Sequence, residues 1–488
     1  MSTSFLGGDA PSALDAIPDG SDARELLAAA LEHAATYVGS LPDRPVGAAL
    51  SASEVSERLP RELPDTPMDP RRVLDDLVAD AESGLVAMNS ARYFGLVVGG
   101  TLPVALAADW MASTWDQNAI LASPSPSVAA IEDIAGAWLL HVFGLPATAS
   151  FAFVTGCQMA HVTALAAARH RVLANVGWNV EQDGLGGAPR VRVIVGEERH
   201  VTVDRALRLL GFGVGCIESV GVDEHGALLI DDLVRRLEGA DGPTIVCGQA
   251  GNVNTGAVDP LAEMCEAAHA AGAWMHVDGA FGLWANASPR HRGLLRGCER
   301  ADSWATDAHM WLNVPYDCGV AIVADREAHR SAMAMRAPFF QHDDPVREPL
   351  SWTPESSRRA RSLPVYAALR SLGRSGVREL VERLCACADR FADRLDSLPG
   401  IELRGHALNQ VLVCATDGDD VTDRLVEEIQ RDGTCWMSGS TWHGRRCVRI
   451  SVCSWRTTFE DVDRSVETVA SALARARDAK RPSRSPSS

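Results

Sequence analysis

Residues 302–316 read DSWATDAHMWLNVPY and place a short apolar run directly before a polar turn. Ser303–Thr306 has the composition of a buried strand, and His309 and Met310 lie in the turn that follows it. Between residues 93 and 325, similar strand-like runs alternate with helical stretches. This alternation predicts an α/β fold with a mostly parallel sheet and helices on both of its faces. The other predicted strands are Ser150–Val154, Val191–Val195, Thr244–Gly248, Ala273–Val277 and Gly319–Val323.

Helical segments flank this region on both sides. Apolar residues at helical spacing predict helices near residues 21–38, 70–83 and 362–398. A strand–helix–strand–helix pattern over residues 408–474 predicts a separate small α/β lobe. We therefore divide the chain into an N-terminal helical segment (1–85), a large domain (86–360), a connecting helix with a small C-terminal domain (361–476) and a disordered tail (477–488).

The composition disfavours several classes of function. The chain has 488 residues and a formal charge of −18, with 46 basic and 64 acidic residues, which argues against a nucleic-acid partner. Neither an apolar run of membrane length nor a signal-peptide pattern is found, so we expect a cytoplasmic protein without a membrane partner. The twelve cysteines lack the spacing of a zinc site, and we expect no metal.

Polar motifs follow several of the predicted strands. Asp278 comes at the end of a strand, and the carboxyl edge of an α/β sheet is where such folds bind ligands. His200 follows another strand in GEERHVTVD (196–204). The stretch FAFVTGCQMAH (151–161) is a strand–turn–helix element whose backbone N–H groups can bind a phosphate. Taken alone, Asp278 is equally a turn or capping residue, and His200 is more often structural.

With the stretches YFGLVVGGTLP (93–103), QAGNVNTGAVDP (249–260) and WTPESSRRAR (352–361), these motifs resemble the group II amino-acid decarboxylases that depend on pyridoxal 5′-phosphate (PLP). This is the superfamily of the aromatic-amino-acid and glutamate decarboxylases. The resemblance covers about residues 91–469. It implies PLP fold type I, as in aspartate aminotransferase, with a seven-stranded sheet. It also implies loss of the α-carboxylate of an amino acid, and a homodimer with its active site at the interface.

The resemblance assigns roles around the cofactor. Asp278 would pair with the pyridine nitrogen, while His200 and Ala280 would pack on the two faces of the ring. The turn at residues 155–158 and His309 would hold the phosphate. The implied cofactor-binding residues are Gly156, Cys157, Gln158, His161, His200, Asn252, Asp278, Ala280, Ser303 and His309.

The family has a lysine after the histidine of this motif, but this chain has Met310. The chain contains one lysine, Lys480, and a thioether cannot form a Schiff base with PLP. Three interpretations follow. The first is a decarboxylase that is impaired or trapped at the external aldimine. The second is a natural lysine-less enzyme that uses non-covalent PLP, pyridoxamine phosphate or histidine acid/base chemistry. The third is a non-catalytic dimer partner.

The candidate catalytic positions are Met310, His200 and His342. In this family a tyrosine of a mobile loop often supplies a proton, yet residues 332–348 contain no tyrosine. His342 is a candidate acid in that loop, because imidazole titrates near neutral pH. A solvated loop histidine is the alternative interpretation.

Candidate substrate contacts are Phe94, Asn118 and Arg359. Arg359 or Arg449 would orient the α-carboxylate, although we interpret Arg449 as an arginine of a structural salt bridge. Aromatic residues near the predicted entrance favour an apolar or aromatic amino acid; they are Phe94, Trp115 and Phe339.

Overall fold

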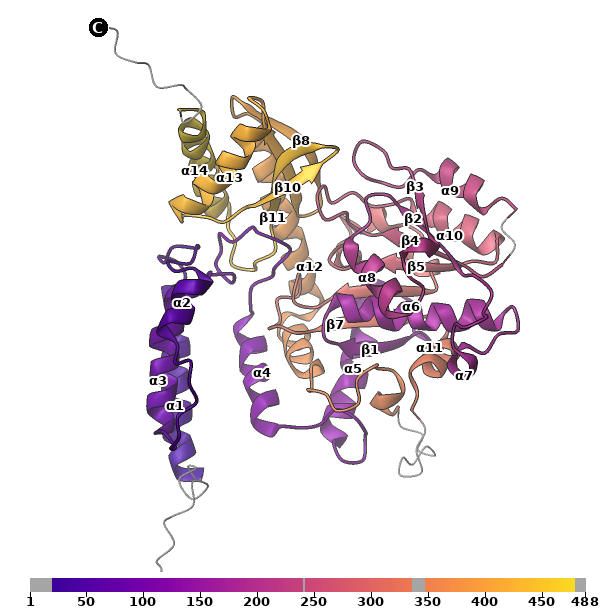
Figure 1. Cartoon of the computed structure of the whole chain (residues 1–488), viewed down its shortest axis with the longest axis horizontal. Coiled ribbons are helices and arrows are strands. Elements are labelled where there is room, and N and C mark those ends of the chain that lie inside the picture. The colour runs from indigo at the N-terminus through magenta and orange to yellow at the C-terminus, as the bar shows by residue number, and fades with distance from the viewer. Residues whose placement is uncertain (1–19, 240–241, 336–346, 479–488) are drawn as a thin grey trace, which may run out of the picture.

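The computed structural model describes residues 20–239, 242–335 and 347–478 (Figure 1). A seven-stranded sheet in the order β1-β7-β6-β5-β4-β2-β3 organises the large domain, which confirms the predicted α/β fold. β3 escaped the sequence prediction, because only one of its four residues is fully buried. The strands are β1 (Ser150–Val154), β2 (Arg192–Gly196), β3 (Ile217–Val220), β4 (Thr244–Gln249), β5 (Trp274–Asp278), β6 (Ser303–Asp307) and β7 (Gly319–Val323).

The direction of the strands positions the site. β3, β2, β4, β5 and β6 run parallel, whereas β7 is antiparallel to both β1 and β6. In the register, Asp278 lies beside both Gln249 and Ala305. Residues that follow β2, β4, β5 and β6 therefore meet at one edge of the sheet.

Successive strand residues point to opposite faces and belong to different cores. Val193 and Val195 pack with one set of helices, while Ile194 packs with the other. The first face is covered by α6 (Cys157–Ala174), α7 (Val180–Asp183), α8 (Val201–Leu209) and α11 (Arg326–Met333). The second is covered by α5 (Pro126–Phe143), α9 (Ile230–Leu237) and α10 (Leu261–Ala270).

A long helical segment, α12 (Ser362–Asp396), which is kinked at Gly373, leads to the small domain (Figure 1). Its antiparallel sheet has the order β10-β11-β9-β8, and α13 (Asp419–Asp432) packs against α14 (Phe459–Asp478) beside it. β8 and β10 were not predicted, because their side chains are mostly only half-buried. The strands are β8 (Ile401–Ala407), β9 (Gln410–Ala415), β10 (Ser438–Trp442) and β11 (Arg445–Ser451).

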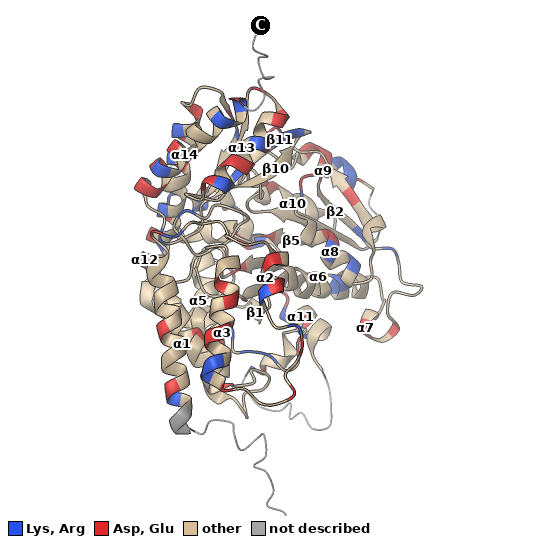
Figure 2. Ribbon diagram, turned by 60° about the vertical axis from the view of Figure 1, so that its left-hand side comes forward, with Lys and Arg blue, Asp and Glu red and all other residues tan. Residues whose placement is uncertain are grey.

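The N-terminal arm comprises α1 (Gly20–Ser40), α2 (Ala52–Arg58) and α3 (Pro70–Ala81), and it lies to the left of α4 (Pro103–Trp115) in the view of Figure 1. No residue of α3 is buried. No helix in the described ranges is both long and apolar enough to cross a membrane. Acidic and basic residues are interspersed on α13 and α14 (Figure 2). The short 3-10 helices are Glu82–Gly84, Val214–Cys216, Gly282–Ala287, Arg292–Leu295, Cys298–Arg300 and Pro349–Ser351.

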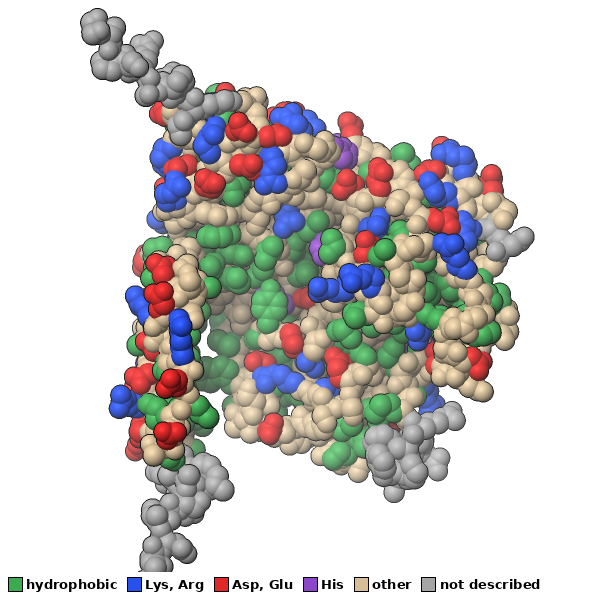
Figure 3. Space-filling model, viewed as in Figure 1, with side chains coloured by type: hydrophobic (Ala, Val, Ile, Leu, Met, Phe, Trp, Pro, Cys, Tyr) green, Lys and Arg blue, Asp and Glu red, His purple; other side chains and the backbone are tan. Residues whose placement is uncertain are grey.

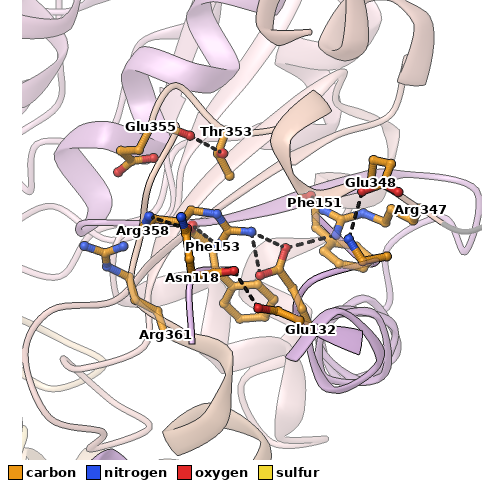
Figure 4. A network of polar contacts seen from close by, with 12 residues as sticks. Asn118, Glu132, Phe151, Phe153, Arg347, Glu348, Thr353, Glu355, Arg358 and Arg361 are labelled. Carbon is orange, nitrogen blue, oxygen red and sulfur yellow. Dashed lines mark hydrogen bonds and ion pairs between the residues drawn. The ribbon is translucent and has the colours of Figure 1, made fainter. Parts of the chain in front are cut away.

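A buried ionic network holds residues 347–361 against the large domain (Figure 4). Glu132 on α5 is fully buried and accepts hydrogen bonds from Arg347 at 3.0 Å and from Arg358 at 2.8 and 2.9 Å. Arg347 also donates to the carbonyl of Phe151 in β1. Arg358 belongs to the stretch WTPESSRRAR (352–361), which resembles the decarboxylase family. At Arg358 this stretch has a structural role.

Candidate functional site

A pocket of about 270 Å³ lies where the carboxyl edge of the large sheet faces the small domain. Residues 96–98 form an apolar wall, and Phe281 adds to it. Arg449 of β11 closes the pocket from the small domain. The residues at or beyond the strand ends that line it are His200, Gln249, Asp278, Ala280, Met310 and Tyr316.

The wall formed by residues 96–98 is held in place by Asn313. The side-chain Oδ1 of Asn313 accepts a hydrogen bond from the Gly100 N–H at 2.8 Å, and the backbone carbonyl of Asn313 accepts one from the Leu102 N–H at 2.8 Å. A side chain at Gly99 would collide with the carbonyl of His309. Glycine therefore allows this wall to lie directly against the turn that carries Met310.

Asp278 is the buried acid of the pocket. Its Oδ1 accepts the Ala280 N–H at 3.1 Å and lies 3.5 Å from Nε2 of His161. Burial tends to raise the pKa of Asp278, but the electrostatic interaction and hydrogen bonding with His161 outweigh it, and the pKa lies well below its usual value. Among the described residues, no group donates a hydrogen bond to Asp278 Oδ2. The carboxylate thus has an unused oxygen at the pocket.

A chain of buried polar groups continues behind Asp278. Nδ1 of His161 lies 3.0 Å from Nε2 of His276, whose Nδ1 lies 2.9 Å from Oγ of Ser303. The indole N–H of Trp274 donates to the same Oγ at 2.9 Å. Burial, followed by the electrostatic interaction with His161, lowers the pKa of His276 to about 3, so its ring is neutral. The predicted residues His161 and Ser303 therefore lie behind Asp278, not at the pocket surface.

His200 lies at the pocket and caps the N-terminus of α8. Its Nδ1 lies 2.8 Å from the hydroxyl of Thr202 and accepts the Thr202 N–H at 3.4 Å. Burial lowers the pKa of His200, which outweighs the opposing effect of Asp278. A neutral imidazole with one fixed nitrogen therefore borders the pocket beside Asp278.

Asp307, which the sequence analysis overlooked, shapes the turn after β6. Its carboxylate accepts the N–H groups of His309 at 2.8 Å, Met310 at 3.2 Å and Cys157 at 3.2 Å. Burial raises the pKa of Asp307 to about 6. One N–H of the predicted phosphate turn is thus bonded to a side chain of the protein. These three N–H groups meet at Asp307 only after the sheet has folded. In the sequence, the position of Asp307 at the end of a predicted strand was therefore the one available sign of its role.

Gly156, Cys157 and Gln158 lie at the start of α6, and the side chains of the last two contact other residues. Gly156 precedes α6 at a φ of 123°, and Gln158 donates to the Thr202 carbonyl at 3.1 Å. Cys157 Sγ lies 3.7 Å from His161 Nε2, and the two form a possible ligand group with Asp278 within 4.8 Å. Burial raises the pKa of the Cys157 thiol well above its usual value.

His309 is buried and stacks on Tyr316 with ring centroids 3.6 Å apart. Its Nδ1 lies 2.7 Å from the carbonyl of Val314, while its Nε2 is buried without a hydrogen-bond partner. Burial lowers the pKa of His309 to about 4. A polar group of a ligand would satisfy this nitrogen.

The interpretation of Arg449 as a salt-bridge arginine is wrong for the described part of the chain. Its guanidinium lines the pocket without an acidic partner, and its buried Nε makes no hydrogen bond. Burial lowers the pKa of Arg449. An unpaired arginine in a pocket is suited to bind an anionic group of a ligand.

Four predicted residues lie away from the pocket of this chain. Phe94 is fully buried and packs edge-on against Phe391, so it cannot contact a substrate. Asn118 bonds to the backbone of Arg358 at 3.1 Å, and Arg359 pairs with Asp109 at 2.8 Å.

The fourth, Asn252, is buried and donates to the Glu198 carbonyl at 3.0 Å, which stabilises a turn. Trp115 lies at the end of α4 and also does not line the pocket. His342 and Phe339 lie outside the described residues.

Comparison with known proteins is consistent with this geometry. A model of the pyridoxal-dependent decarboxylase conserved domain matches residues 53–415. The chain is 25% identical to the aromatic-L-amino-acid decarboxylase of Bacillus atrophaeus, over 90% of this chain and 93% of that protein. It is 30% identical to the L-2,4-diaminobutyrate decarboxylase of Rhizobium meliloti, over 75% of this chain and 74% of that protein.

Solved structures share the fold. The crystal structure of Oryza sativa TDC with PLP and tryptamine matches with a TM-score of 0.88 at 22% identity, over 94% of this chain and 99% of that one. The crystal structure of mouse CSAD matches with a TM-score of 0.87 at 20% identity, over 93% of this chain and 99% of that one. With the strand-end acid, the bordering histidine and the domain match in agreement, the chain belongs to the pyridoxal-dependent amino-acid decarboxylase family.

Proposed function

We propose that this protein binds PLP without a covalent bond and is an amino-acid carboxy-lyase whose turnover is strongly reduced by Met310. The observation that carries the proposal is the set of residues around one pocket: Asp278 with an unused oxygen, neutral His200, Ala280 and Met310. These groups suit the pyridine ring of the family's cofactor, and no amine is among them.

Different residues of the pocket would bind different parts of PLP. Asp278 would accept the ring N–H at its free Oδ2, and His200 and Ala280 would border the ring. The orphaned Nε2 of His309 offers a further polar contact. When bound, PLP supplies an electron sink for the electron pair left by a departing carboxylate.

Arg449 is the residue that we assign to the substrate's α-carboxylate, because it lines the pocket and has no acidic partner within the described ranges. Residues 96–98 and Phe281 would exclude water and leave space for an apolar side chain. The named activity of the Bacillus atrophaeus relative supports an aromatic or apolar amino acid as the substrate.

The missing amine determines the expected rate. A lysine at position 310 would hold the cofactor, receive the amino acid and release the product, and the Met310 thioether can do none of these. We therefore expect decarboxylation that is slower by several powers of ten than in a Met310→Lys variant.

The test uses the full chain and compares Met310→Lys with Met310→Leu, which matches the size of methionine but adds no amine. Equilibrium dialysis should show PLP binding to all three proteins. After borohydride reduction, mass spectrometry should find a pyridoxyl group at position 310 in Met310→Lys alone. Absence of PLP binding to the wild-type chain would refute the proposal, as would a pyridoxyl group on Met310→Leu within residues 20–478.

A second candidate is a different reaction on non-covalent PLP or pyridoxamine phosphate, with His200 as the base. Its neutral ring beside Asp278 favours this candidate. Product analysis separates the two, because decarboxylation releases carbon dioxide and the corresponding amine. Formation of other products, lost in His200→Phe but kept in Met310→Leu, would favour the second candidate.

We also propose that the protein is a cytoplasmic homodimer. Leu27, Leu31, Val73 and Leu77 of the arm are 48–59% exposed, an apolar surface that a second copy would cover. Hydrophobic side chains also gather between the arm and the body of the protein (Figure 3). Sedimentation of the wild-type chain should give a dimer, and Leu27→Asp with Leu77→Asp should give a monomer. A monomeric wild type would contradict this proposal.

A further inference from the structure

The chain of polar groups behind Asp278 has a direction that the chemistry of its ends determines. The indole N–H of Trp274 can only donate, so Ser303 Oγ accepts from it. In the described structure, Ser303 Oγ has one other partner, Nδ1 of His276. The Ser303 hydroxyl therefore donates its proton to His276 Nδ1, because a buried hydroxyl proton without an acceptor is costly.

This direction assigns the proton positions of both histidines. His276 is neutral and carries one N–H. Since its Nδ1 accepts, the proton lies on Nε2 and is donated to Nδ1 of His161 at 3.0 Å. His161 then carries its proton on Nε2, which faces Asp278 at 3.5 Å. Every link therefore points its proton toward the carboxylate.

We propose that Trp274, Ser303, His276 and His161 are positioning residues that keep Asp278 an ionised acceptor, so that the pocket selects a ligand with a protonated ring nitrogen. The identity of that ligand rests on the proposed function, but the direction of the chain does not. Each donor is polarised by the one before it, which stabilises a charge that burial would otherwise disfavour. The proton on His161 Nε2 also leaves that nitrogen without a lone pair for a metal ion.

The first test reads the direction without any ligand. The full chain is labelled with ¹⁵N-histidine, and the ring nitrogens are assigned with His161→Asn and His276→Asn. Both rings should show a protonated Nε2 and an unprotonated Nδ1. A proton on Nδ1 of His276 would overturn the proposal. Trp274→Phe keeps the ring but removes the donor, and it should let His276 populate the other tautomer.

The second test measures the effect on ligand choice. The probes are PLP and its 1-deaza analogue, in which a C–H replaces the ring nitrogen. The wild-type chain should bind PLP about 10- to 100-fold more tightly than the analogue, as expected for a hydrogen bond to a charged group. His161→Asn and Ser303→Ala should each reduce that ratio by about tenfold. Trp274→Phe should reduce it less.

The matched control is His329→Asn. His329 is also fully buried and bonded at both ring nitrogens, to Ser150 at 2.8 Å and Trp352 at 2.9 Å, but it does not line the pocket. It should lower stability without changing the ratio. An unchanged ratio in His161→Asn, Ser303→Ala and Trp274→Phe would overturn the proposal even if PLP binds. If PLP does not bind, the proposed function fails, while the histidine tautomers still decide whether the chain of donors exists.

Discussion

The cluster around Glu132 and the cluster around Asp278 are both buried polar groups in the same domain, but they are organised differently. Both oxygens of Glu132 accept hydrogen bonds from arginines (Figure 4). Asp278 instead has His161 behind it at 3.5 Å, and none of the described residues donates a hydrogen bond to its Oδ2. A cluster in which charges are paired internally serves stability, whereas an unused acceptor at a pocket wall is available to a ligand.

The largest effect on stability is expected at Glu132, whose carboxylate neutralises two buried arginines. Glu132→Gln should lower the free energy of unfolding by about 3–5 kcal/mol, because Arg347 and Arg358 remain buried without a counter-charge. Denaturant unfolding measures the loss. PLP affinity of the folded fraction should be unchanged, and a loss of affinity at equal folded fraction would place this cluster in the functional site.

The opposite pattern is expected at Asp278. Asp278→Asn should weaken PLP binding by about 10- to 100-fold, since a neutral amide replaces the charged acceptor. Stability should be maintained or increase, because a buried charge is removed. Equilibrium dialysis and thermal unfolding measure the two effects. Asp259→Asn is the control, because Asp259 is also buried but does not line the pocket, and its carboxylate accepts the backbone N–H groups of Gln249 and Leu228.

Lowering the pH tests a third kind of buried polar group, the histidines that are neutral in the folded protein. Burial lowers the pKa of His329 to about 3, while an unfolded histidine titrates near pH ~6.5. Its neutral form therefore contributes stability that is fully present above pH ~6.5 and is lost as the pH falls toward 3, by about 1.4 kcal/mol per unit.

Unfolding of the wild type and His329→Gln across this range should show the wild type losing stability relative to the variant as the pH falls. His276 should follow the same sign, because burial also lowers its pKa to about 3. A constant difference between wild type and variant would show that His329 takes up a proton as readily in the folded protein as in the unfolded chain.

The smallest effect is expected at Arg359, the former candidate for substrate binding. Arg359 pairs with Asp109 at the surface, so Arg359→Ala should change stability by about 0–1 kcal/mol. Affinity for the amino acid should not change, because Arg359 does not line the pocket. Arg449→Met should instead weaken amino-acid binding, and the reverse result would restore Arg359 as the carboxylate contact.

The parts of the site that the sequence could predict are those tied to strand ends. Asp278, His200 and Met310 follow apolar strands, and parallel strands must bring their carboxyl ends to one edge. Phe94 and Arg359 were misplaced because a motif does not tell which way a side chain points. Phe94 is directed into the core, and Arg359 is directed toward α4.

The amino-acid sequence alone determined the α/β fold, the two-lobed organisation and the absence of an amine at position 310, because periodicity and residue identity are local properties. The tertiary structure decided which polar groups meet. His161, His276 and Ser303 lie far apart along the chain, and only the packing of α6 against the sheet joins them behind Asp278. It likewise brought Arg449 to the pocket without an acidic partner among the described residues, since such partners are set by distance in space.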